Sequence, residues 1–142
     1  MDPRPSVAGY SGTPLPKKLG IKPDSVVALV GAPAGFEKTL GELPAGAVLR
    51  RNARRPAHLT LCFVRTRAEL GRRIRALARA AAQGGLWICW PKKASGVPTD
   101  LTESAVRERG LAAGLVDFKV CAVDATWSGL RFARRKLKQA AG

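Results

Sequence analysis

The sequence predicts an α/β domain with a mostly parallel β-sheet that ends in an antiparallel hairpin. Two observations support this fold class. Short runs of β-branched and apolar residues, typical of strands buried on both faces, alternate with segments of helical periodicity over most of the chain. The last two apolar runs are separated only by a short turn, which permits a hairpin but no crossover. No apolar run approaches the roughly 20 residues that a membrane-spanning helix requires.

The chain begins with residues 1–13, which are rich in proline and glycine and predict an irregular arm. Residues 14–19 can form one or two helical turns that end at Gly20. Val26–Val30 is a continuous β-branched run and predicts a buried strand, followed by the small-residue loop Gly31–Phe36. We expect a short helix near 36–42 and a weaker second strand at 47–50.

The third strand, 58–64, leads into the strongest helix pattern in the chain, residues 67–82. Thr66 is a candidate N-cap, because Glu69 follows it at the capping-box spacing. The apolar residues of this helix fall on one face and its arginines on the opposite face. The apolar set is Leu70, Ile74, Leu77 and Ala81, and the basic set is Arg72, Arg75 and Arg79.

The fourth strand, 86–90, stops at Pro91 and opens into a polar loop. Thr99 or Asp100 can cap the next helix, which we place at 101–112. A hairpin of strands 116–123 and 130–134 follows, with Trp127 in its turn, and residues 136–142 form a basic tail. The chain is therefore predicted to contain one domain, residues 14–135.

The residues suited to catalysis or metal binding do not form a recognisable constellation. Cys62, Cys89 and Cys121 lie inside apolar runs with no CxxC spacing, which predicts buried free thiols. His58, the only histidine, opens a strand and is interpreted as structural or solvent-facing. The carboxylates are scattered, and the phosphate-loop and HExxH motifs are absent. We therefore predict no catalytic residue and no metal site.

The candidate ligand site lies at one edge of the sheet. Right-handed crossovers bring the loops after the first, third and fourth strands to the same edge, which is where α/β proteins bind ligands. Lysines and hydroxyl groups in these loops suit an anion, particularly a phosphate. The predicted ligand-binding residues are Gly31, Pro33, Gly35, Arg65, Arg67, Lys92, Lys93, Ser95, Thr99 and Asp100.

The formal charge of +15 widens the range of partners to phosphorylated small molecules, acidic proteins and nucleic acid. A nucleic-acid site would track phosphates with arginines, although no aromatic stacking series accompanies them. The residues of this alternative are Arg50, Arg51, Arg54, Arg55, Arg72, Arg75, Arg79, Arg134 and Arg135. The remaining alternative is that the charge reflects background composition.

The phrases GYSGTPLPKKLGIKP, WPKKASGVPTDLTE and VDFKVCAVDATWSGLRF resemble the bacterial domain-of-unknown-function 3052 family, over nearly the whole chain. That family label implies a Rossmann-like fold and no established activity. The order of the strand phrases also resembles a shortened class I methyltransferase sheet, a three-layer sandwich closed by a hairpin. This second resemblance implies S-adenosylmethionine as a possible cofactor.

The chain departs from the methyltransferase pattern at three places, one of which is the absence of a strand and a helix between its second strand and His58. Ala32 and Pro33 occupy positions of the first turn where that pattern has glycine, and Arg50 and Arg51 stand where an acid would hold the ribose. An arginine pair suits a phosphate or a carboxylate instead. We therefore expect a cytoplasmic, non-catalytic module without a cofactor that binds an anionic small molecule or acidic partner. An adenosylmethionine-dependent enzyme and a nucleic-acid binder are the alternatives, and the hairpin edge could pair two copies.

Overall fold

A computed structural model describes residues 12–136, which form one six-stranded sheet in the order β2-β1-β3-β4-β6-β5. Strands β1 to β4 are parallel, β6 is antiparallel to β4, and β5 is antiparallel to β6. The mostly parallel sheet with a terminal hairpin is therefore confirmed. The strands are β1 Val26–Val30, β2 Val48–Arg50, β3 Leu59–Phe63, β4 Gly85–Pro91, β5 Leu115–Ala122 and β6 Trp127–Arg134.

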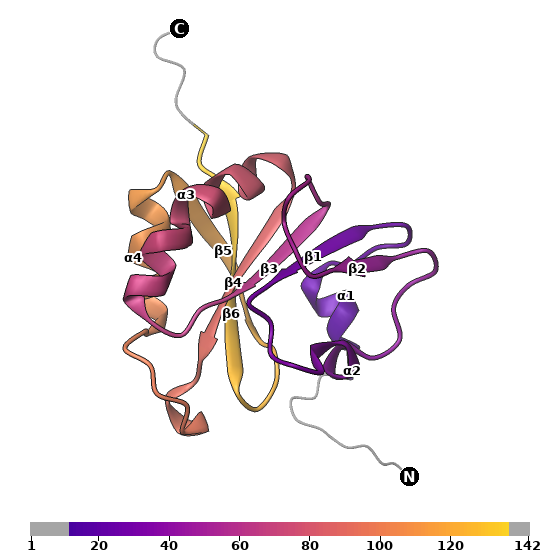
Figure 1. Ribbon diagram of the computed structural model, residues 1–142, viewed down its shortest axis with the longest axis horizontal. Helices are drawn as coiled ribbons and strands as arrows, with labels where there is room; N and C mark the ends of the chain where they lie inside the picture. Colours follow the sequence, from indigo (N-terminus) through magenta and orange to yellow (C-terminus); the bar gives the residue numbers. More distant parts are fainter. Residues whose placement is uncertain (1–11, 137–142) are drawn as a thin grey trace, which may run out of the picture.

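Helices cover both faces of the sheet and make the Rossmann-like three-layer sandwich (Figure 1). Two short helices pack with one apolar cluster, and two longer helices pack with the other. The first pair is α1 Leu15–Leu19 and α2 Phe36–Leu40; the second pair is α3 Arg67–Gln83 and α4 Glu103–Ala112. A single 3₁₀ turn, η1 Lys93–Ser95, lies in the loop after β4.

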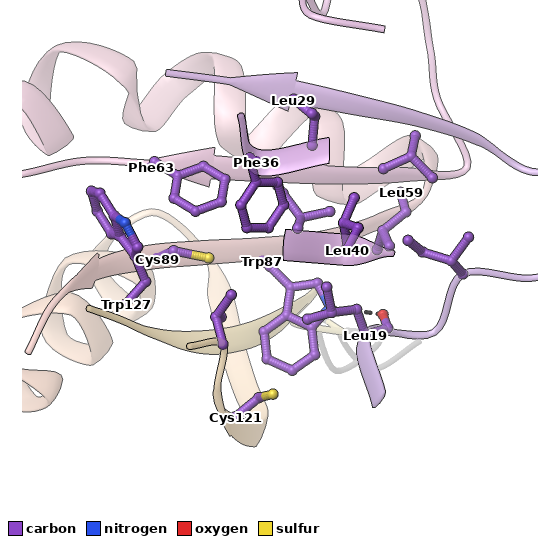
Figure 2. Close-up of a cluster of buried hydrophobic side chains, with 14 residues drawn as sticks. Leu19, Leu29, Phe36, Leu40, Leu59, Phe63, Trp87, Cys89, Cys121 and Trp127 are labelled. Carbon is purple, nitrogen blue, oxygen red and sulfur yellow. Dashed lines mark hydrogen bonds between the residues drawn. The ribbon is translucent and has the colours of Figure 1, made fainter. Parts of the chain in front are cut away.

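The cluster beneath α1 and α2 contains the aromatic residues Phe36, Phe63, Trp87 and Trp127 (Figure 2). Trp87 is fully buried there, and its indole Nε1 donates a 2.9 Å hydrogen bond to the carbonyl of Leu19. Because a buried indole N–H requires an acceptor, this bond fixes the end of α1 against the sheet. Trp87 is thus a core residue of this face of the sheet.

The cluster on the opposite face joins α3 and α4 to the sheet. Leu70, Ile74 and Leu77, the predicted apolar face of α3, are buried there. Gly110 of α4 lies against the ring of Phe132, and a Cβ at that glycine would come within 2.4 Å of the ring. Close packing of α4 onto β6 therefore depends on glycine, which has no side chain, at position 110.

Two boundary predictions were wrong. Helix α4 begins at Glu103 and is capped by Thr102, whose hydroxyl accepts from the N–H of Ala105. Thr99 and Asp100, the predicted caps, instead bond to the chain after β3.

Trp127 is the first residue of β6 and pairs with Pro91; it does not lie in the turn. The Asp124 carboxylate closes the turn early by accepting the N–H groups of Thr126 and Trp127.

The predicted arm (1–13) and tail (136–142) fall almost entirely outside the described residues. Within residues 12–136, no helix is long and apolar enough to cross a membrane.

Candidate functional site at the carboxyl edge of the sheet

The carboxyl ends of β1 and β3 lie side by side where the chain changes direction across the sheet. From β1 the chain continues to β2 on one side, whereas from β3 it continues to β4 on the other. Gly31, immediately after β1, has φ +69°, and a Cβ there would lie 2.7 Å from the Phe63 carbonyl oxygen. Glycine is required because the two strand ends approach so closely. Such a switch point is the usual ligand position in an open α/β sheet.

The loops after β3 and β4 are also tied together. The Thr99 hydroxyl donates a 2.6 Å hydrogen bond to the carbonyl of Arg65. The Asp100 carboxylate accepts from the backbone N–H of Arg67 at 2.8 Å, and the Arg67 side chain donates back to the Asp100 carbonyl at 3.0 Å. The structure thus brings together two of the three loops that the sequence placed at this edge.

A row of packed aromatic rings lies beneath this edge of the sheet (Figure 2). Phe63 packs edge-on against Phe36 and Trp127, with ring centroids 4.8 and 5.0 Å apart. The guanidinium of Arg65 lies 5.0 Å from the centre of the Trp127 ring. The backbone N–H of Lys92 donates to the carbonyl of Thr126 at 2.7 Å. Trp127 therefore joins the hairpin to the edge. Sequence reasoning missed this role, and the Asp124 turn was the signal that could have revealed it.

The hydroxyl groups of the loop after β4 are used within the protein. Ser95 donates to the carbonyl of Lys92 and accepts from the N–H of Val97, at 2.6 and 3.1 Å. Thr99 likewise accepts from the N–H of Leu101. These groups shape the loop, so a ligand would meet the side chains of half-buried Lys92 and exposed Lys93.

Arg51 clamps the loop after β1. Its guanidinium forms two 2.9 Å hydrogen bonds with the carboxylate of Glu37. The same group donates to the carbonyls of Ala32 and Pro33 at 3.1 Å. Hydrogen bonding to Arg51 lowers the pKa of the Glu37 carboxyl to about 2. Arg51 therefore binds a carboxylate of its own chain, a use that the sequence did not reveal.

The predicted basic residues divide into several groups. Arg50 donates to the carbonyls of Asn52, Arg55 and Pro56, so it supports the segment after β2. Arg54, Arg55 and Arg79 line one hollow beside α3, while Arg72 and Arg75 are exposed on the same helix. Exposed Arg134 and Arg135 lie at and just after the end of β6.

The cysteines and the histidine have structural roles. All three cysteines are free and buried, as predicted. Burial raises the pKa of Cys62 to about 12 and that of Cys89 well above its ordinary value, which keeps both thiols protonated. The Nδ1 atom of His58 accepts a 2.9 Å hydrogen bond from the N–H of Val26. Among residues 12–136, no three His, Cys, Asp or Glu side chains gather as a metal site.

Two solved structures illustrate what this fold is similar to. An S-adenosylmethionine-dependent methyltransferase from Aquifex aeolicus is similar over 82% of this chain and 85% of its own, with 16% identity and a TM-score of 0.58. The DhpI–SAH complex is similar over 86% of this chain and 82% of its own, with 10% identity and a TM-score of 0.57. These likenesses establish the methyltransferase-like fold. No family model and no curated protein matches the chain, so the resemblance to the domain-of-unknown-function family rests on its sequence phrases alone.

The expectation that the protein is a module without a cofactor is contradicted by this comparison. The DhpI–SAH complex has the same fold and holds SAH (S-adenosylhomocysteine). Two features of this chain fit an adenosyl ligand: the switch point between β1 and β3, and the glycine turn packed on Phe63. One feature differs, because β2 ends at Arg50 and is followed by Arg51, with no acid there for the ribose.

Proposed function

We propose that the protein is a methyltransferase-like module that binds S-adenosylmethionine or SAH at the carboxyl edge of its sheet. The observation that carries this proposal is the turn at Gly31, pressed against the Phe63 carbonyl at the switch point of a methyltransferase-like sheet. The backbone of residues 31–35 would contact the adenosyl group. Arg65, positioned over Trp127 at the same edge, would receive the carboxylate of the amino-acid portion.

The test is calorimetric titration of the protein with SAH, using a variant that obstructs the edge. Ala34 is exposed in the loop after β1, so Ala34→Trp adds bulk at the proposed site without disturbing the core. We expect SAH to bind the unmodified protein and the affinity to fall about tenfold or more in the variant, equivalent to about 1.4 kcal/mol.

The matched control is Ala45→Trp. Ala45 is also exposed, but it lies in the turn before β2, at the opposite edge of the sheet. This variant should retain full affinity. Absence of binding at millimolar SAH, or equal losses in the two variants, would contradict the proposal.

A second candidate function is phosphate binding by the loop after β4. The observation that favours it is that two basic residues flank Trp127: the Arg65 guanidinium lies over its ring, and the backbone N–H of Lys92 is bonded to the carbonyl of the preceding residue. Inorganic phosphate should raise the melting temperature of the protein, and Lys92→Ala with Lys93→Ala should abolish the increase. An unchanged increase would remove this loop as the site.

A further inference from the structure

The connection from β2 to β3 is unusually short for a parallel crossover. Such crossovers normally need a dozen or more residues and usually contain a helix. Here residues 51–58 make the connection, and they contain no helix. A right-handed crossover in this direction passes over the face that α3 covers (Figure 1). The helical layer on that face is therefore incomplete beside α3.

A hollow of about 570 Å³ occupies the missing part of the layer. Val30 of β1 and Thr60 of β3 form its floor, and Ala76, Leu77 and Ala80 of α3 form one wall.

The crossover segment forms the opposite wall. Arg50 fixes this segment, because its side chain donates to the carbonyls of Asn52, Arg55 and Pro56. The hollow is consequently bounded by structure on both sides.

Arginines surround this largely apolar floor. Arg54, Arg55, Arg73 and Arg79 line the hollow, and no acidic residue does so. Arg54, Arg55 and Arg79 are exposed and form no ion pair within the described chain. Arg73 makes only a 3.8 Å contact with Glu69, and its Nε has no hydrogen-bond partner there. The rim therefore carries positive charge that the described chain leaves largely uncompensated.

We infer that this hollow binds an acidic amphipathic helix of a partner protein. A helix is the element that normally fills this place in the layer, so the space beside α3 suits its shape. The apolar stripe of the partner would cover Val30, Ala76 and Ala80, while its carboxylates would pair with the arginine rim.

Two other occupants fit less well. A second copy of this chain brings another +15 charge to a basic surface, which is repulsive. Nucleic acid would satisfy the arginines, but the hollow has no aromatic residue on which bases could stack.

A fluorescent model peptide of about 18 residues tests the inference, since this length supports a helix. It carries leucines at helical i, i+3, i+4 and i+7 spacing and glutamates on the remaining face. A scrambled peptide of identical composition is the comparison. We expect the amphipathic peptide to bind at least about tenfold more tightly at about 150 mM salt.

Two pairs of variants locate the binding, each with one change in the hollow and one control outside it. Arg54→Glu with Arg79→Glu should weaken peptide binding about tenfold or more. Lys38→Glu with Arg109→Glu changes the net charge by the same amount outside the hollow and should leave peptide binding unchanged. Ala76→Trp should fill the hollow and block binding without a charge change. Ala82→Trp, on an exposed part of α3 outside the lining, should not.

Three results would overturn the inference: no binding, equal binding of the scrambled peptide, or tighter binding of a random oligonucleotide that displaces the peptide. Because none of the hollow variants belongs to the loop after β1 or to the loops after β3 and β4, they should leave SAH titration unchanged. Failure of this inference is thus separable from failure of the proposed function.

Discussion

The Arg51–Glu37 pair illustrates how single residues acquire a role that their sequence positions conceal. Arg51 follows β2 and Glu37 lies in the first turn of α2, so nothing in the local pattern joins them. In the folded chain, the planar guanidinium matches the carboxylate and also reaches the carbonyls of Ala32 and Pro33. Arg51 thereby holds the loop that we propose as part of the adenosyl site.

We predict that Glu37 titrates far below an ordinary carboxyl group. Its pKa is lowered from 4.5 to about 2 by the Arg51 hydrogen bonds, so the clamp is fully formed above about pH 4.5 and is lost as pH falls toward 2. Carboxyl-carbon NMR shifts should show this low midpoint. Arg51→Gln should return the midpoint toward 4.5, and a midpoint near 4.5 in the unmodified protein would disprove the clamp.

At the scale of elements, local signals predicted α3 and failed at the start of α4. Thr66 caps α3 by accepting from the N–H of Glu69, as its sequence spacing predicted. Before α4, three polar residues compete for the cap within four positions, and the sequence favours none strongly. Tertiary contacts recruit Thr99 and Asp100 to the Arg65–Arg67 segment, which leaves Thr102 as the cap.

Two helical glycines should respond oppositely to alanine. In an open helix this change stabilises by about 1 kcal/mol. At Gly110 the new Cβ would meet the buried Phe132 ring at 2.4 Å, and such overpacking costs about 1–3 kcal/mol, which outweighs the gain. Gly110→Ala should therefore lower the free energy of unfolding.

Gly71→Ala in α3 is the matched control. Its Cβ would meet only the Arg109 side chain, at 3.1 Å, and that arginine is exposed and free to move. Denaturant unfolding should show Gly71→Ala as neutral or stabilising. A stabilised Gly110→Ala would mean that α4 does not pack on β6 as described.

At the scale of the whole molecule, net charge should select between the two adenosyl ligands. The chain carries +15, and Arg65, Arg67, Lys92 and Lys93 lie at or beside the proposed edge. S-adenosylmethionine has a positive sulfonium that SAH lacks, so the field of the protein disfavours it.

We therefore predict tighter binding of SAH than of S-adenosylmethionine in parallel calorimetric titrations. The difference should narrow as salt rises above about 0.15 M, because the screening length falls below about 8 Å. Equal affinities at low salt, or a preference for S-adenosylmethionine, would show that local contacts outweigh the global charge.

The sequence alone determined the sheet class, the main helix and the terminal hairpin, because hydrophobic periodicity and loop length are local properties. It also indicated that the loops after β3 and β4 meet at one edge, since crossover handedness is nearly invariant. Only the tertiary structure decided that Trp127 joins the core, that Arg51 clamps the loop after β1, and that the short β2–β3 crossover leaves a basic hollow. Each of these depends on contacts between residues distant in the chain, for which a local pattern gives at most a hint, such as the Asp124 turn before Trp127.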